Sequence, residues 1–159
     1  MTKPTVAILP TSTSNGADAL ITTKDITDIK QLKGKSVYGL ALTVSEYTFV
    51  RNLELSGEKE GDYKFTNMDP AAAALAMQQK QKGYEAIVVW NPFVMETLNK
   101  RDDVHVLVDS TKIPGEIVDM VVMSQASLDK PGGAAFAHAV IDAFYAVSAK
   151  IEDLSLIHI

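Results

Sequence analysis

The chain contains no cysteine. Disulfide bonds, thiolate metal sites and a cysteine nucleophile are therefore excluded. The absence of cysteine does not identify the cellular compartment, because cytosolic and periplasmic proteins alike can lack cysteine. The sequence also has no Gly-x-Ser-x-Gly nucleophile elbow. Its three histidines, His105, His138 and His158, do not have the spacing of metal ligands. We therefore expect no metal and no cofactor.

Positive charge is also scarce. Lysine and arginine together number 15 against 20 acidic residues, which gives a net charge of −5 and no basic cluster. Such a surface binds nucleic acid or anionic membranes poorly, so we expect no nucleic-acid partner. No apolar run approaches the roughly 20 residues of a membrane-spanning helix. The first residues, MTKPT, show no charged region followed by an apolar core, so no signal peptide is visible.

What the 159 residues do contain is an alternation of strands and helices. Short apolar runs predict strands, and helical spacing or capping residues predict the helices. The expected strands are 6–9, 19–23, 36–41, 63–67, 86–90, 104–108 and 116–123, and the expected helices are 44–55, 70–80, 92–99 and 131–151, with a helical turn at 28–32. From Ser36 to Val108 the order is β-α-β-α-β-α-β, which is typical of a parallel sheet with right-handed crossovers.

Polar side chains follow two of these strands. Ser45, Glu46 and Tyr47 lie where the strand 36–41 turns into a helix, and Trp90 and Asn91 follow the strand 86–90. Open α/β sheets bind ligands at this carboxyl edge, and free N–H groups at a helix start suit an anionic or polar head group. A helix cap at Thr43 or Ser45, and a core tryptophan with a capping asparagine, are the alternatives.

Two loops complete the candidate set. Asn15–Asp18 (NGAD) precedes a strand, and its glycine would let the backbone approach a ligand while Asp18 could pair with a cation; a plain turn is the alternative. Asp109–Glu116 (DSTKIPGE) lies where the strand–helix alternation breaks. It is a candidate crossover between two lobes, with Asp109, Ser110, Pro114 and Gly115 as hinge residues.

At these positions the sequence resembles the solute-binding proteins of ABC importers, in the nitrate/sulfonate/taurine group that includes thiamine-precursor binders. The resemblance rests on Leu32–Val37 (LKGKSV), Ser45–Tyr47 (SEY) and Val89–Pro92 (VWNP). Asp109–Ile117 (DSTKIPGEI) is similar to the branch encoded beside urea carboxylase, and NGAD at 15–18 is similar to an Asn-Gly-Asn-Asp stretch there. The likeness extends from about Asn15 to Lys150.

The resemblance implies an α/β, periplasmic-binding-protein type II-like fold, with one complete parallel-sheet lobe plus partial segments of the other. Residues 1–35 would be partial lobe one, 36–110 lobe two, and 111–153 the crossover strand and helix returning to lobe one. The resemblance further implies a monomer that works with a membrane permease and performs no chemistry. The full-length protein would be periplasmic or a lipid-anchored extracellular protein.

Family members are longer than this chain, with a signal peptide and a further N-terminal part of lobe one. The two first strands here lack obvious helical partners, and residues 154–159 (LSLIHI) resemble translated adaptor sequence. The sequence therefore suggests a C-terminal fragment with a non-native tail.

The solute suggested by the urea-carboxylase branch is urea- or guanidine-like. Asp18, Glu46 and the carbonyl of Asn91 would accept its hydrogen bonds and Trp90 would form an apolar wall, with Ser45 as a further hydrogen-bonding group. Nitrate, a sulfonate such as taurine, or a pyrimidine are alternatives within the group. A stand-alone α/β regulatory module is the alternative outside it. The related fungal thiamine-pyrimidine synthases need a histidine and cysteine arrangement that this cysteine-free chain lacks.

Overall fold

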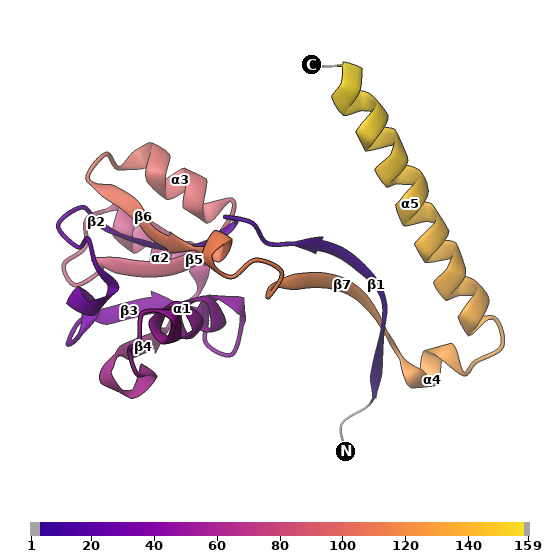
Figure 1. The fold of residues 1–159 in the computed structure, drawn as a ribbon, viewed down its shortest axis with the longest axis horizontal. Coiled ribbons are helices and arrows are strands. Elements are labelled where there is room, and N and C mark those ends of the chain that lie inside the picture. Colours follow the sequence, from indigo (N-terminus) through magenta and orange to yellow (C-terminus); the bar gives the residue numbers. More distant parts are fainter. Residues whose placement is uncertain (1–3, 158–159) are drawn as a thin grey trace. The chain divides into compact units, whose positions relative to one another are not determined.

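The computed structural model describes residues 4–157 and divides the chain into two compact units (Figure 1). Unit 2 comprises Thr13–Ile117, and unit 1 comprises the segments up to Ser12 and from Val118 onward. Of the predicted tail, residues 158 and 159 lie outside the described part, and 154–157 continue the backbone of the last helix. The tail's origin stays a prediction.

Unit 2 is built on a five-stranded sheet in the order β4-β3-β5-β2-β6. These strands are β2 (Asp18–Thr23), β3 (Ser36–Gly39), β4 (Lys64–Asn67), β5 (Ala86–Trp90) and β6 (Val104–Asp109). Strand β3 pairs in parallel with both β4 and β5, whereas β2 is antiparallel to β5 and β6. The α/β fold class predicted from the sequence is confirmed.

Helices cover both faces of this sheet because its central strands are apolar on both sides. One face packs against α2 (Pro70–Gln78) and α3 (Phe93–Lys100) in a core that contains Ala19, Ile21, Met77, Ile87 and Val89. The other face packs against α1 (Val44–Leu55) and the turn η1 (Ile29–Leu32), with Leu20, Phe49, Leu53 and Val88 in its core. Successive residues of β2 and β5 alternate between the two cores, as a pleated strand requires.

Local sequence signals account for these helices. Thr43 caps α1, which spans 44–55 as predicted. Asp69 caps α2 by accepting the backbone N–H groups of Ala71 and Ala72, and Pro70 occupies the first helical position. Gly39 ends β3 where a Cβ atom would lie 2.8 Å from the Phe65 ring and 2.9 Å from a carbonyl oxygen of β5. Glycine lets the three neighbouring strands approach there.

The boundaries of unit 2 differ from the expected ones. Residues 13–35, expected in lobe one, lie in unit 2 together with 36–117. The physical reason is β2, which is buried along nearly its whole length and inserts between β5 and β6. The sheet is therefore mixed, not purely parallel as the alternation of strands and helices predicted. Residues 111–117, expected with the returning crossover, also stay in unit 2.

Unit 1 contains a two-stranded ribbon of β1 (Thr5–Thr13) and β7 (Val118–Ser124), the short α4 (Gln125–Leu128), and α5 (Gly133–Ile157). Ser12 Oγ donates to Asp119 Oδ2 over 2.9 Å, and the Gln125 N–H donates to the Pro4 carbonyl. These contacts at opposite ends show that the two strands run antiparallel.

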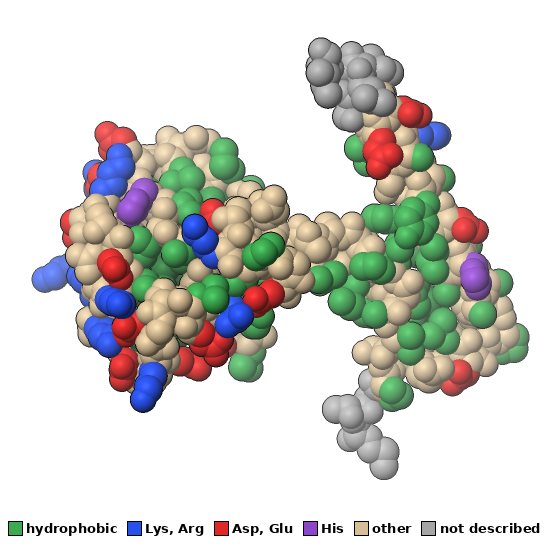
Figure 2. Space-filling view, viewed as in Figure 1, with side chains coloured by type: hydrophobic (Ala, Val, Ile, Leu, Met, Phe, Trp, Pro, Cys, Tyr) green, Lys and Arg blue, Asp and Glu red, His purple; other side chains and the backbone are tan. Residues whose placement is uncertain are grey.

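Much of unit 1 is apolar and exposed. Figure 2 shows apolar side chains gathered over β7 and α5, and the large exposed ones are Val118, Met120, Val122, Phe136, Tyr145, Val147 and Ile151. Residues Gly133–Asp153 have a mean hydropathy of 1.3 and are long and apolar enough to cross a membrane. The expectation that no apolar run approaches this length was wrong for this helix, whose apolar residues are separated by scattered polar ones. Core helices of soluble proteins pass the same test.

Candidate functional site

The sheet of unit 2 brings most of the predicted site residues to one edge, the one formed by the carboxyl ends of its parallel strands. Asp18 pairs in register with Trp90, and Ala19 pairs with Asp109. The loop before β2 therefore lies beside the turns that follow β5 and β6. Strand β3, which leads into α1, is the other neighbour of β5. Antiparallel insertion of β2 is what carries the 15–18 loop to the carboxyl ends of the parallel strands (Figure 1).

A buried hydroxyl network anchors the 15–18 loop. Ser14 Oγ donates to Asp18 Oδ2 over 2.6 Å and lies 2.8 Å from Ser110 Oγ, which also accepts the Gly16 N–H over 2.7 Å. Ser14, Asp18 and Ser110 are all buried, whereas Asn15 at the tip is exposed. Gly16 has a φ of 87°, which favours glycine. The segment is therefore a fixed loop that presents backbone and the Asn15 side chain outward.

Trp90 and Asn91 lie next to this loop. The Asn91 N–H donates to the Ala17 carbonyl over 3.0 Å, and the Asn91 side chain is exposed. The alternative in which Asn91 caps α3 is wrong, because Pro92 occupies the cap position and makes no side-chain bond there. Trp90 is half-buried and meets the Phe93 ring edge-on at 6.3 Å. The partly exposed Trp90 indole and the exposed Asn91 carboxamide therefore both lie at the carboxyl end of β5.

At the start of α1 the local bonds are also internal. Thr43 caps the helix through the Ser45 N–H over 3.3 Å, so the capping alternative is confirmed for Thr43. Glu46 Oε2 accepts the Leu42 N–H over 2.6 Å. Ser45 is 1% exposed, and its hydroxyl has no hydrogen-bond partner among the described residues. The first turn of α1 thus carries the Glu46 carboxylate, which bonds the backbone just before the helix, and the buried Ser45 hydroxyl.

Leu42 is a feature that sequence reasoning missed. Its φ is 59°, its side chain is 96% exposed, and the Glu46 carboxylate holds its N–H. A bulky residue in the left-handed region is uncommon and costs free energy. No local pattern distinguishes it, because the bond that supports it comes from the next helical turn.

Tyr47 and the hinge candidates have definite places. The Tyr47 hydroxyl donates to Glu116 Oε2 over 2.6 Å, and this bond raises the pKa of Tyr47. Asp109 caps the 3-10 turn η3 (Ser110–Lys112) through the Thr111 N–H. Ser110 is fully buried, and Pro114 and Gly115 are exposed. All four hinge candidates lie inside unit 2, before the boundary at Ile117–Val118, and their hinge role stays a prediction.

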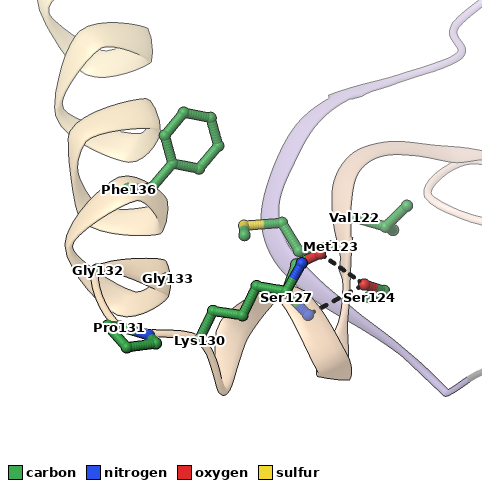
Figure 3. A pocket seen from close by; sticks show the side chains of 9 residues that line it. All are labelled: Val122, Met123, Ser124, Ser127, Lys130, Pro131, Gly132, Gly133 and Phe136. Atoms are coloured by element: carbon green, nitrogen blue, oxygen red, sulfur yellow. Dashed lines mark hydrogen bonds between the residues drawn. The ribbon is translucent and has the colours of Figure 1, made fainter.

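A pocket of about 520 Å³ lies in unit 1 and contains none of the predicted site residues (Figure 3). It is lined by Val122, Met123, Ser124, Ser127, Lys130, Pro131, Gly132, Gly133 and Phe136. Ser124 Oγ is already engaged, since it bonds the Ser127 hydroxyl and accepts the Ser127 N–H as the cap of α4. Among the described residues, no group of three or more acidic, histidine or cysteine side chains could hold a metal ion.

No family model matches the chain, and no curated protein matches it. Solved structures do. The periplasmic aliphatic sulphonate binding protein SsuA from Escherichia coli is 22% identical with a TM-score of 0.78, over 95% of this chain and 50% of its own. The alkanesulfonate-binding protein SsuA from Xanthomonas axonopodis pv. citri, bound to MOPS, is 17% identical with a TM-score of 0.73, over 88% and 47%.

A third structure is the ligand binding component of an ABC-type import system from Staphylococcus aureus, solved with zinc bound. It is 14% identical with a TM-score of 0.58, over 77% of this chain and 43% of its own. The chain thus spans about half the length of these three structures, or less. At these identities the likeness establishes the fold, and this chain has the α/β fold of periplasmic-binding-protein type II-like proteins.

Proposed function

We propose that this chain is part of the solute-binding component of an ABC importer, which captures a small polar solute between two lobes. One observation supports this proposal most directly. At one edge of the unit 2 sheet, the loop before β2 meets the turns after β3, β5 and β6. Ligands of open α/β sheets bind at this edge. The solved structures with this fold include proteins described as sulfonate-binding and as an importer component, which supports the same reading.

The solute favoured by the charges is planar and rich in donors, such as urea or guanidinium. Asp18 and Glu46 place two carboxylates at this edge, and no predicted site residue is a lysine or arginine. Glu46 lies over the N-terminus of α1, where an anion would otherwise bind, and accepts the Leu42 N–H. A planar solute could stack on Trp90 while the Asn91 carboxamide bonds its edge.

A sulfonate or nitrate is the second candidate. Ser45 supplies a buried hydroxyl at the start of α1 that has no hydrogen-bond partner among the described residues, and helix N-termini favour anions. The E. coli protein is described as binding aliphatic sulphonates and the Xanthomonas protein as binding alkanesulfonates, which supports the same candidate. This candidate requires Glu46 to swing away from the Leu42 N–H or to be neutralised.

The remaining parts of the proposal concern the full-length protein. We propose that it is periplasmic or lipid-anchored, monomeric, engaged with a membrane permease, and without chemical turnover. The apolar surface of β7 and α5 supports a unit 1 that further polypeptide completes. Because two lobes share the solute in such a protein, unit 2 by itself would bind more weakly than the whole.

Isothermal titration calorimetry of the 159-residue chain tests the proposal. Guanidinium chloride, urea, sodium nitrate and taurine are titrated against it, with sodium chloride as the blank. We expect heat with guanidinium or urea, and a loss of about tenfold or more in guanidinium affinity in Glu46→Gln, because a bond to a charged group is lost. Glu60→Gln, an exposed glutamate of unit 2 outside this edge, is the matched control.

The outcomes separate the candidates. Heat with taurine or nitrate that Glu46→Gln leaves intact or increases supports the anion reading instead. Equal loss for guanidinium and taurine in Glu46→Gln contradicts the argument from charge. No heat with any of the four compounds contradicts solute capture by this part of the protein.

A further inference from the structure

One carboxylate oxygen joins α1 to the segment that precedes β7. Glu116 Oε2 accepts the Tyr47 hydroxyl over 2.6 Å and Arg51 Nε over 2.8 Å. The donors stand 69 and 65 residues before Glu116 in the sequence. Bonds in which a group is ionised are shorter and stronger than neutral ones. The segment is thus fastened to two successive turns of one face of the helix.

The groups at this contact favour its charged form. The Arg51 and Tyr47 hydrogen bonds hold the pKa of Glu116 below its ordinary value, and Glu116 in turn raises the pKa of Arg51. Arg51 Nη1 also bonds Glu54 of the same helix over 3.0 Å, which orients the guanidinium. At neutral pH the contact is therefore an ion pair with an added phenol donor.

Glu116 lies directly beside the point where the chain passes from unit 2 to unit 1. The next residue, Ile117, is the last of unit 2, and its carbonyl accepts the Ser14 N–H over 3.0 Å. Ser14 lies just after the other crossing between the units, at Ser12–Thr13. Both connections are thus bonded to each other within unit 2, immediately beside the residue that α1 holds.

We propose that Glu116 is a positioning residue that fastens the inter-unit connections to α1. A displacement of the first turns of α1 then reaches the connections through Tyr47 and Arg51. The functional half of this inference rests on the proposed solute capture, since Ser45 and Glu46 open the same helix. Tyr47, a ligand candidate by sequence, serves the fastening in this arrangement.

Hydrogen-exchange mass spectrometry of the full 159-residue chain tests the fastening without any solute. Glu116→Ala is compared with Glu54→Ala, which removes the other carboxylate that Arg51 contacts but leaves the connection tied. We expect exchange in peptides that contain the Ser14 and Glu116 amides to accelerate roughly three- to tenfold in Glu116→Ala only. Peptides of β5 should not change in either variant.

A double variant distinguishes fastening from general loosening. Tyr47→Phe should accelerate the same peptides in the wild-type background and add nothing in Glu116→Ala, because the two residues act through one bond. Additive effects would overturn the fastening. So would equal acceleration in Glu54→Ala, or no acceleration in Glu116→Ala. If exchange accelerates throughout unit 2 in Glu116→Ala, the single variant Tyr47→Phe becomes the test. An unchanged exchange rate of the Ser14 peptide in Tyr47→Phe then refutes the inference.

Guanidinium chloride at millimolar concentration tests transmission. We expect it to slow exchange of the Ser14 and Glu116 peptides at least twofold in the wild type and not in Glu116→Ala. Equal slowing in both proteins overturns the transmission. Failure of guanidinium to bind the wild type would refute the donor-rich solute and, with it, transmission from that solute, while the fastening result stands by itself.

Discussion

The hydroxyl of Ser14 makes the sharpest prediction for stability. It is buried, donates to the Asp18 carboxylate over 2.6 Å and contacts Ser110 Oγ at 2.8 Å. A buried hydrogen bond to a charged group contributes about 1.5 to 3 kcal/mol. Ser14→Ala should therefore lower the free energy of unfolding of unit 2 by about 2 kcal/mol. For a unit of this size, that corresponds to a fall in midpoint of roughly 6 to 12 °C.

Thermal unfolding followed by tryptophan fluorescence measures this change. Trp90 is the single tryptophan, and it pairs in register with Asp18 in the sheet of unit 2. Thr27→Ala is the matched control in unit 2, because the Thr27 hydroxyl also bonds a side chain, that of Gln31, but is exposed, so its loss should change stability by less than about 0.5 kcal/mol. A midpoint in Ser14→Ala within about 2 °C of the wild type, or equal losses in both variants, would refute the reasoning.

Three further predictions concern packing, pH and surface. Gly39→Ala should lower the unfolding midpoint by roughly 4 °C or more, since its Cβ would overlap a ring and a carbonyl; Gly61→Ala, with open space, should not. Arg101 holds the pKa of Asp103 below its ordinary value. The stabilisation from that pair is therefore present above about pH 4 and lost as the pH falls below it. When unfolding midpoints are measured at a series of pH values, the midpoint of Asp103→Asn should fall less between about pH 4 and lower pH than that of the wild type. Because the Phe136 ring is 61% exposed on an apolar surface, we expect the 159-residue chain to self-associate in analytical ultracentrifugation and Phe136→Lys to reduce this association; unchanged sedimentation would argue against this surface.

Local signals were enough to predict most of the fold. Each expected strand and helix has a counterpart in the structure, and the capping residues Thr43 and Asp69 place the first turns of α1 and α2. What local signals could not predict is the pairing of β2. A six-residue apolar strand suits any interior place in a sheet, and only the register with β5 and β6 reveals that it runs antiparallel between them.

The candidate site was predictable in part for the same reason. The place of Trp90 and Asn91 follows from where β5 ends, whereas Asp18 reaches the same edge only through the antiparallel pairing of β2. The bonds that fasten this edge do not follow from local signals, because Ser14 and Ser110 are 96 residues apart, and Arg51 and Glu116 are 65 apart. Neither pair leaves a trace in local spacing. Leu42 was missed for another reason: its partner Glu46 is only four residues away, but nothing in the residue types marks Leu42 for a left-handed backbone.

The measurement that tests solute capture most directly is an amide chemical-shift titration of the ¹⁵N-labelled 159-residue chain with guanidinium chloride, with sodium chloride as the blank. We predict saturable shifts centred on the amides of Asp18, Glu46 and Asn91 and on the indole N–H of Trp90. Shifts confined to the pocket residues Ser124–Phe136, or no saturable shifts in unit 2, would contradict the proposal that this sheet edge binds the solute.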